Sequence, residues 1–195
     1  MLRVKNLYFL IGTICICAAA FLFAKNILED KAVNKNTQII VDKIKQAKAK
    51  EGIDKKRYLD NPNMEMPIKM INGYDYIGYL RIESLELDLP ILSSWSYPNI
   101  KISPARFQGS IYQNNMIILA HNYDAHFGKL YKLKENDKIC FYDMANNKFT
   151  FKVKIIEDVR GDEVEKLLSG DWDLTLFTCT LSGEFRTLVR CDLEG

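Results

Sequence analysis

Three side chains of the types used in covalent catalysis lie in the C-terminal half of the chain: His121, Cys179 and Arg186. A cysteine nucleophile needs an easily deprotonated thiol, a partner that transfers protons, and a donor that stabilises a developing oxyanion. The chain contains two histidines and five cysteines, so each role has few candidates. These residues predict a site built from a cysteine, a histidine and an arginine.

Cys179 is the preferred nucleophile because of its position. It ends the apolar run Leu174–Thr178, and a strand end can hold a side chain rigidly while leaving it open to substrate. Cys140 and Cys191 lie inside strand-like segments. For any of the three cysteines, Cys179 included, the alternative is a buried side chain that behaves as a small hydrophobic residue. Three cysteines follow the apolar N-terminus, and an odd number leaves at least one thiol free.

His121 follows the apolar run Met116–Ala120, so it also stands at an expected strand end. It is the preferred proton-transfer group, although a strand-end histidine can equally serve as a structural hydrogen-bonding residue. His126 lies in a turn beside Phe127, where a surface or capping role is expected.

Arg186 begins the last expected strand, seven residues after Cys179. Two antiparallel strands joined by a short loop would place these two residues close together. An arginine in that position favours the thiolate and can donate to an oxyanion. Arg190 lies about 13 Å further along the strand, so a structural role is expected for it.

From Tyr74 onward the sequence consists of short β-type runs separated by turn residues. Helical signals are limited to a turn around His126–Leu133 and to Asp162–Leu168, with Asp162 as the expected N-cap. This pattern predicts an all-β domain, a closed barrel of about seven or eight strands with short helices. The expected strands are Tyr76–Ile82, Leu87–Leu92, Met116–Ala120, Lys138–Tyr142, Lys148–Asp158, Leu174–Cys179 and Arg186–Leu193.

The uncharged run Leu7–Ala24 is just long enough to cross a bilayer core of about 30 Å. Arg3 and Lys5 precede it, and the positive-inside rule keeps such an N-terminus in the cytoplasm. We expect a single-pass anchor with the folded domain outside the cell. A cleaved signal peptide is the alternative, but Leu22 is bulky for the position three residues before a cleavage site after Ala24.

Three segments are expected: a cytoplasmic tip and anchor over residues 1–24, a polar helical stalk over 25–63, and a catalytic domain over 64–195. The stalk has a narrow apolar stripe at helical spacing, and we interpret it as a solvated spacer that frays near Gly52 and ends before Pro62. Residues 25–60 carry ten Lys/Arg against six Asp/Glu, whereas residues 61–195 carry fifteen against nineteen. The mildly acidic domain argues against a nucleic-acid partner.

Taken together, these motifs resemble the sortase family over about Tyr76 to Leu193. The run Thr175–Cys179 matches the TLxTC signature, Ile118–Asn122 matches the strand-end histidine, and Arg186–Arg190 matches the strand that carries the arginine. The order histidine, cysteine, arginine is also that of the family. The resemblance implies a sortase-like β-barrel and a cysteine transpeptidase.

The resemblance further implies a reaction. Cys179 would attack the Thr–Gly carbonyl of an LPxTG-like sorting signal on a surface protein, His121 would protonate the leaving amine, and Arg186 would hold the substrate or the oxyanion. An amine of the peptidoglycan precursor or of a pilin would accept the acyl group. Asn122 and Thr178, beside the two catalytic positions, are expected to contact substrate.

No organic cofactor is expected, because sortases need none. Calcium is possible, since some sortases bind it, but no residue pattern indicates a site for it. A structural zinc is not expected either, because the cysteines and histidines lack the spacing of a zinc site.

The class within the family is open, although class B is the closest match. His121–Tyr123 and Phe127–Gly128 resemble class B, but class B usually has serine at Phe177 and a long helix before Leu174. The strand Arg186–Arg190 instead resembles the pilus-building class.

Other functions are compatible with a cysteine and a histidine. L,D-transpeptidases place glycine directly before the nucleophile, where this chain has Thr178, and papain-like peptidases place the cysteine before the histidine. A non-catalytic adhesion or scaffolding barrel is the remaining alternative.

Overall fold

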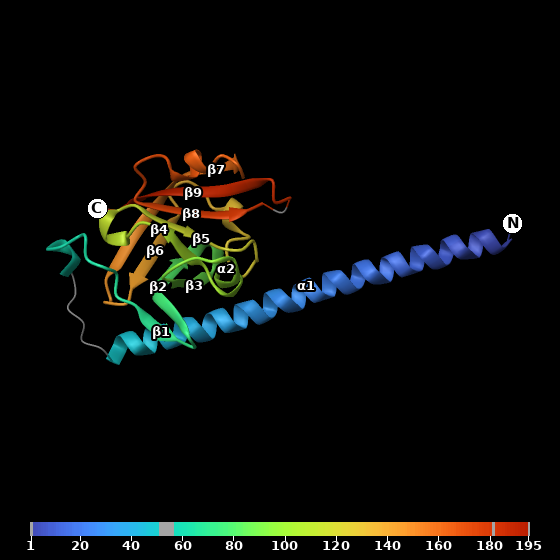
Figure 1. Ribbon diagram of the computed structural model, residues 1–195, viewed down its shortest axis with the longest axis horizontal. Coiled ribbons are helices and arrows are strands. Elements are labelled where there is room, and N and C mark those ends of the chain that lie inside the picture. Colours follow the sequence, from blue (N-terminus) through green and yellow to red (C-terminus); the bar gives the residue numbers. More distant parts are fainter. Residues whose placement is uncertain (1, 51–56, 181, 195) are drawn as a thin grey trace.

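The computed structural model describes residues 2–50, 57–180 and 182–194. Within them, a β-barrel sits beside the C-terminal half of one very long helix, α1 (Figure 1). The strands are β1 (Lys69–Ile71), β2 (Tyr74–Ile82), β3 (Leu87–Leu92), β4 (Ala105–Gln108), β5 (Met116–Leu119), β6 (Lys138–Asp143), β7 (Lys148–Arg160), β8 (Leu174–Cys179) and β9 (Phe185–Leu193). The helices are α1 (Leu2–Lys50), α2 (Tyr97–Ile102) and α3 (Val164–Leu168), with 3-10 turns η1 (Arg57–Leu59), η2 (Glu83–Leu85), η3 (Ile111–Gln113) and η4 (Leu130–Lys132).

The strands follow the order β1-β2-β3-β4-β5-β8-β9-β7-β6, and β6 pairs back onto β2. Strands β2 to β9 therefore form a closed barrel, which leaves few exposed sheet edges. β1 pairs with β2 along residues 74–76, and β6 pairs with it along residues 78–82. The pairs β3–β4 and β5–β8 are parallel, and the other pairs are antiparallel.

Closure depends on a glycine at the seam. Gly78 has φ of 153°, and a Cβ at this position would lie 2.1 Å from the carbonyl oxygen of Tyr142 on β6. Only a residue without a side chain allows the two strands to approach this closely. The interior is filled by fully buried apolar side chains such as Leu80, Phe141 and Leu176, so the barrel is a packed core rather than a channel.

The fold confirms the expected sortase-like barrel with short helices, and each of the seven expected strands is present with boundaries shifted by at most two residues. Two short strands, β1 and β4, and the helix α2 were not anticipated. The expected N-cap was wrong: α3 begins after Glu163, which makes no side-chain capping bond, and Asp162 instead pairs with Arg160.

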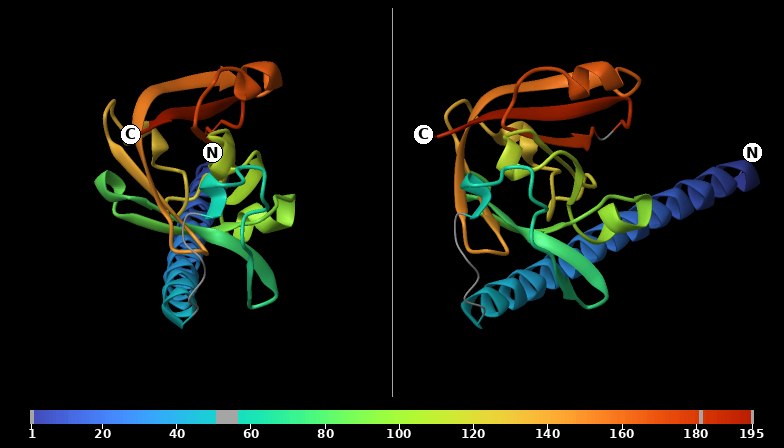
Figure 2. Two further views of the ribbon diagram at one scale, coloured as in Figure 1. Left: turned by 90° about the vertical axis from the view of Figure 1, so that its left-hand side faces the viewer. Right: turned by 60° about the vertical axis from the view of Figure 1, so that its left-hand side comes forward.

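The apolar N-terminal half of α1 extends away from the barrel (Figures 1 and 2). Within Tyr8–Ala47, α1 contains an 18-residue stretch that is long and apolar enough to cross a membrane. Large apolar side chains on this half, including Phe9 and Phe23, are exposed. This exposure suits a segment surrounded by lipid.

The second half of α1 packs against the barrel, so the interpretation as a solvated spacer is wrong for this part. Ile40, Val41 and Ile44 are buried in a cluster with Tyr76 and Tyr79 of β2. The narrow apolar stripe is therefore a docking face. The predicted fraying near Gly52 lies outside the described residues, since the helix is described to Lys50.

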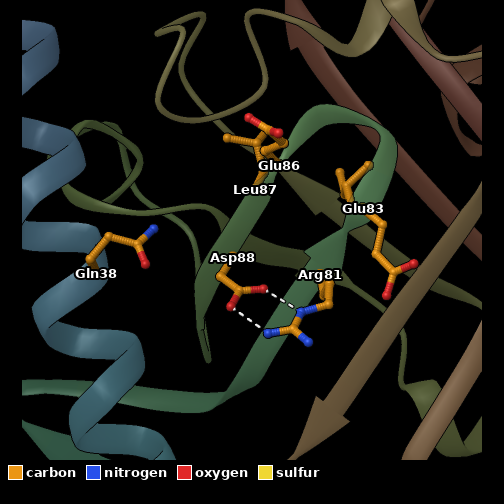
Figure 3. A pocket seen from close by; sticks show the side chains of 7 residues that line it. Gln38, Arg81, Glu83, Glu86, Leu87 and Asp88 are labelled. Carbon is orange, nitrogen blue, oxygen red and sulfur yellow. Dashed lines mark hydrogen bonds and ion pairs between the residues drawn. The ribbon is translucent and has the colours of Figure 1, made fainter.

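An ion-pair network between Lys45 of α1 and the barrel reinforces the docking, and Figure 3 shows its Arg81–Asp88 part. Asp88 of β3 accepts two hydrogen bonds from Arg81 of β2, at 2.7 and 2.8 Å, and one from Lys45 of α1, at 2.9 Å. These contacts hold the pKa of the Asp88 carboxyl below its usual value, with the Arg81 hydrogen bonds as the largest cause. Gln38 points from α1 toward the same pair.

Residues just beyond the helix also belong to the barrel. Tyr58 in η1 stacks on Tyr112 with a ring separation of 4.9 Å and packs against Phe149 at 5.2 Å. The last residues of the segment 25–63 thus contact the barrel. The boundary between stalk and catalytic domain stays a prediction.

The docking face can be tested by truncating one side chain. Ile44→Ala should weaken the docking of α1 by about 2–4 kcal/mol, because it removes a fully buried isoleucine. Hydrogen exchange of the backbone amides of residues 37–47 in the detergent-solubilised chain would measure this change. Ile39→Ala is the matched control, since Ile39 is 43% exposed and should have little effect. Equal acceleration in both variants would contradict the docking.

Candidate active site

Cys179 is the last residue of β8, and its burial differs from that of the strand before it. Residues Leu174–Thr178 are buried, whereas the Cys179 side chain is exposed. The strand thus fixes the cysteine backbone from within the barrel while the thiol faces solvent. On the neighbouring strand β9, Arg186 lies directly opposite Cys179, as the spacing of the two residues predicted.

The parallel pairing of β5 with β8 brings His121 to the same edge of the barrel. Leu119 of β5 pairs with Phe177 of β8. His121 and Cys179 each come two residues later, so they lie at the same end of this strand pair. Two hydrogen bonds join the chains there: the Ala120 amide donates to the Phe177 carbonyl at 3.2 Å, and the Thr178 hydroxyl donates to the Ala120 carbonyl at 2.9 Å. The three candidate catalytic residues therefore gather at one edge of the sheet.

A pocket of about 350 Å³ lies at this edge, and Cys179, His121 and Arg186 all line it. Its walls are mainly apolar, because aromatic and aliphatic side chains from β4, α2, α3 and the barrel strands face it. Phe107 packs edge-to-face on Phe177 at a ring separation of 5.6 Å and also contacts Trp95 at 5.4 Å. The remaining apolar wall residues are Tyr97, Ile100, Leu119, Ala120, Val159, Val164 and Leu167.

The guanidinium of Arg186 borders the pocket and is anchored on one side. Its Nη1 donates to the carbonyls of Gly183 and Phe185 at 2.9 and 3.0 Å. Gly161 lies under the guanidinium, where a Cβ would come within 3.2 Å of it. The arginine is thus held at the pocket margin with a cationic group facing the same space as the thiol.

The imidazole of His121 is partly buried and stacks on Tyr123 with a ring separation of 4.3 Å and an interplanar angle of 9°. Burial lowers its pKa below the usual value, and the positive charge of Lys101 adds to this effect. The ring is therefore biased toward its neutral form, which can accept a proton from a thiol.

His126 is fully buried, so the expected surface or capping role is wrong. Neither ring nitrogen has a partner with good hydrogen-bond geometry within the described residues, although the Ile102 backbone lies near enough to oppose part of the pKa shift. The ring packs edge-on against Tyr123 at 5.6 Å. Burial, with a smaller effect from His121, lowers the pKa of His126 to about 4. His126 supports the stack beneath His121 as a neutral, apolar-like side chain.

The other candidate residues differ in whether they line the pocket or lie in the interior of the barrel. Thr178 lines the pocket, but its hydroxyl is engaged by the Ala120 carbonyl. Asn122 is half-buried and is not among the described residues that line the pocket. Cys191 is fully buried, and burial raises the pKa of its thiol. Cys140 is also buried, which makes both poor nucleophiles.

Arg190 is 2% exposed, and its role in the structure is to tie elements together. It donates to the carbonyls of Lys166 and Leu167 in α3, to the hydroxyl of Thr175 at 3.2 Å, and to Glu157 at 3.2 Å. Since α3 supplies part of the pocket wall, Arg190 positions this wall without facing the thiol.

The pocket walls from α2 and β4 were missed by the sequence reasoning. A helix-start signal was available, because Ser96 is followed by Tyr97 and Pro98. Ser96 indeed caps α2 through a hydrogen bond from the Asn99 amide to its hydroxyl at 3.1 Å. β4 spans only four residues, too few for a clear alternation.

Comparison with known proteins agrees with this geometry. A sortase-domain family model matches residues 80–194. Sortase A of Bacillus anthracis is 27% identical over 146 residues, which cover 70% of this chain and 69% of that protein. The chain belongs to the sortase family, whose members are cysteine transpeptidases.

Solved sortase structures share the fold. Sortase C of Streptococcus pneumoniae superposes with a TM-score of 0.64 at 19% identity, over 80% of this chain and 96% of that one. Sortase C of Clostridium perfringens SM101 gives a TM-score of 0.54 at 25% identity, over 85% and 95%. A second structure of the Clostridium perfringens enzyme, with its C-terminal cell wall sorting motif, gives 0.55 at 25% identity, over the same shares of the two chains. The class within the family stays a prediction.

No group of three or more histidine, cysteine, aspartate or glutamate side chains within the described ranges is placed to hold a metal ion. Sortases as a family generally work without a cofactor. The apolar pocket itself offers one histidine and one cysteine beside the carboxylate of Glu163.

The buried histidine makes stability depend on pH. His126 has a folded pKa of about 4 against 6.5 when unfolded, so the unfolded chain binds its proton first as the pH falls. The contribution of neutral His126 to the free energy of unfolding is fully present above about pH 6.5 and is lost as the pH falls toward 4. Urea unfolding should show a loss of about 2 kcal/mol between about pH 7 and 5 that His126→Phe largely removes. An unchanged loss in the variant would contradict this assignment.

Proposed function

We propose that this protein is a membrane-anchored sortase that cleaves an LPxTG-like sorting signal on surface proteins and transfers the acyl group to an amine. The observation that carries the proposal is the single pocket that brings together Cys179, His121 and Arg186. Family membership supports the class of reaction. The expected acceptor is an amine of the peptidoglycan precursor or of a pilin.

In the proposed mechanism, His121 accepts the thiol proton of Cys179, and its lowered pKa favours the neutral starting form. The thiolate attacks the scissile carbonyl, and the Arg186 guanidinium stabilises the oxyanion or holds the substrate backbone. The C–N bond breaks while the imidazolium donates its proton to the leaving amine. The incoming amine then attacks the thioester and loses its proton to His121, which releases the product and the thiol.

The shape of the pocket supports a peptide substrate. Its apolar walls suit a hydrophobic side chain, and the exposed thiol stands at its margin. The Clostridium perfringens sortase C solved with a C-terminal cell wall sorting motif offers a precedent for such a ligand. Thr178 and Asn122 are proposed to contribute to substrate binding from positions beside the catalytic pair.

The proposed location is the cell membrane of a Gram-positive cell. The apolar half of α1 supports a single-pass anchor, and the basic residues before it favour a cytoplasmic N-terminus with the catalytic domain outside. The alternatives of an L,D-transpeptidase or a papain-like peptidase receive no support from the strand-end placement of Cys179 or from the family.

The covalent step can be observed directly. Incubation of the full chain in detergent with a sorting-signal peptide should give a peptide adduct on Cys179 by mass spectrometry, and a ligated product when a glycine- or lysine-type amine is added. Cys179→Ala should abolish both, because no other described cysteine lines the pocket. Cys140→Ala is the matched control and should retain activity. An adduct on another cysteine, or hydrolysis without ligation for every amine, would refute the proposal.

The two arginines of β9 should have separable effects. Arg186→Ala should lower kcat by about 10²–10³-fold in a stably folded protein, as expected for loss of an oxyanion donor. Arg190→Ala should instead lower the melting temperature, because it leaves buried partners on α3 and β8 unsatisfied. Circular dichroism melts and steady-state kinetics separate the effects. A larger loss of kcat in folded Arg190→Ala would reassign the catalytic arginine.

A further inference from the structure

The docked part of α1 contacts the barrel at several positions along the helix axis, and each position meets a different part of the barrel. Nearest the apolar half, the Asp30 carboxyl is partly buried beside Asp124, Ala125 and Lys129, where burial and the Asp124 charge raise its pKa against the opposing effect of the two backbone amides and of Lys129. These three residues belong to the segment that follows His121. Further along, Lys43 donates to Asn72 at 2.9 Å, and Lys45 donates to Asp88 at 2.9 Å.

This order gives the barrel a direction relative to the helix. Asp30 lies six residues beyond Ala24, the end of the apolar run, which is about 9 Å along a helix. Lys45 lies fifteen residues beyond Asp30, about 22 Å further. The barrel edge that carries the ends of β5 and β8 is therefore the edge nearest the apolar half, and in Figure 1 both strands point toward the side on which the N-terminus lies. We call it the catalytic edge.

Side chains at the rim of the pocket suit such a position. Trp95, Tyr97 and Val164 line the pocket and are exposed, Tyr97 by 75%. Ile102 at the end of α2 and Leu168 at the end of α3 do not line the pocket but are exposed on the same short helices. Tryptophan and tyrosine favour the interface between membrane and water, because each combines an apolar ring with a polar group. An exposed aromatic and aliphatic rim is unusual for a surface that faces only water.

We propose that α1 is a rigid strut that holds the catalytic edge against the outer surface of the membrane, with the pocket rim as the surface that meets the lipid headgroups. The strut acts through its docked half, which the Ile40–Ile44 cluster and the Asp88 ion pairs lock to the barrel. Asp30 is the positioning residue at the membrane end. This inference rests on the proposed membrane orientation, not on the proposed chemistry.

Asp30 is suited to that role because it is not satisfied by α1 itself. Its Oδ1 is buried without a hydrogen-bond partner in the described ranges. Burial, with the negative charge of Asp124 added to it, raises the pKa of the Asp30 carboxyl, and the backbone amides of Asp124 and Ala125 and the charge of Lys129 oppose this rise only in part. Lys129 itself pairs with Asp124 at 3.7 Å. The strut thus contacts the same segment that carries His121 and the buried His126.

The chain contains its own depth probes, since its two tryptophans lie at opposite edges of the barrel. Trp95 lines the pocket, whereas Trp172 precedes β8 and so lies at the opposite end of that strand from Cys179. The full chain is reconstituted in liposomes that contain lipids with a spin label on the headgroup, which quenches nearby fluorescence. Trp172→Phe isolates the signal of Trp95, and Trp95→Phe isolates that of Trp172.

The expected result is stronger quenching of Trp95 than of Trp172. Seven residues inserted after Ala24 add about 10.5 Å, close to two full turns, and should abolish the difference without disturbing the docked half. The same seven residues inserted after Lys50, beyond the docked part, should leave it unchanged. Equal quenching of both tryptophans, stronger quenching of Trp172, or no effect of the first insertion would overturn the strut.

The quenching experiment measures the orientation of the barrel and needs no turnover. Its failure is therefore distinguishable from a failure of the proposed transpeptidation, which the peptide assay measures. The role of Asp30 is read separately from hydrogen exchange at the Asp124 and Ala125 amides. Asp30→Ala should accelerate exchange there, whereas Asp42→Ala, which removes an exposed aspartate from the same helix, should not. Unchanged exchange in Asp30→Ala would remove Asp30 from the proposal.

Discussion

The parallel pairing of β5 with β8 is the constraint on which the site depends. Parallel strands in register end at the same edge of a sheet, so the residues at their ends become neighbours although 58 positions separate the bonded pair Ala120 and Thr178. The Thr178 hydroxyl completes this junction by satisfying a carbonyl that the ladder would otherwise leave open. Without this register, His121 and Cys179 would be two strand ends with no shared pocket.

Rigidity at that edge comes from buried polar contacts outside it. The Arg190 guanidinium donates hydrogen bonds to a carbonyl of α3 and to the hydroxyl of Thr175. These bonds fix α3, and with it the pocket wall, to the barrel. A buried arginine is costly to leave unpaired, so the wall and the barrel are energetically linked. Arg186 stays at the margin with carbonyl partners from the β8–β9 loop. The two arginines of β9 therefore have different positions: Arg190 is buried and holds α3, whereas Arg186 lies at the margin of the pocket.

The sequence was sufficient for the barrel and for the three residues of the pocket, because long apolar runs with polar ends leave few alternatives. It was insufficient for β1 and β4, which are too short for a periodic signal. His126 was misread because a turn position does not reveal that the turn folds inward. The stripe on α1 was ambiguous for a physical reason: the four apolar residues Val33, Ile40, Ile44 and Ala47 at helical spacing are equally compatible with a weakly amphipathic solvated helix and with a docking face.

The docking of α1 changes what an anchor helix does mechanically. A flexible linker of a few dozen residues would let the domain sample a volume several nanometres across, so pocket height and orientation would be undetermined. A helix packed by Ile40, Val41 and Ile44 and bonded through Lys45 instead transmits its own axis to the barrel. Asp30 lies beside Asp124 and Ala125, shortly after His121, so the helix that is apolar enough to cross a membrane also packs close to the segment that carries His121. One face of one helix therefore makes the contacts that join the apolar segment to the barrel.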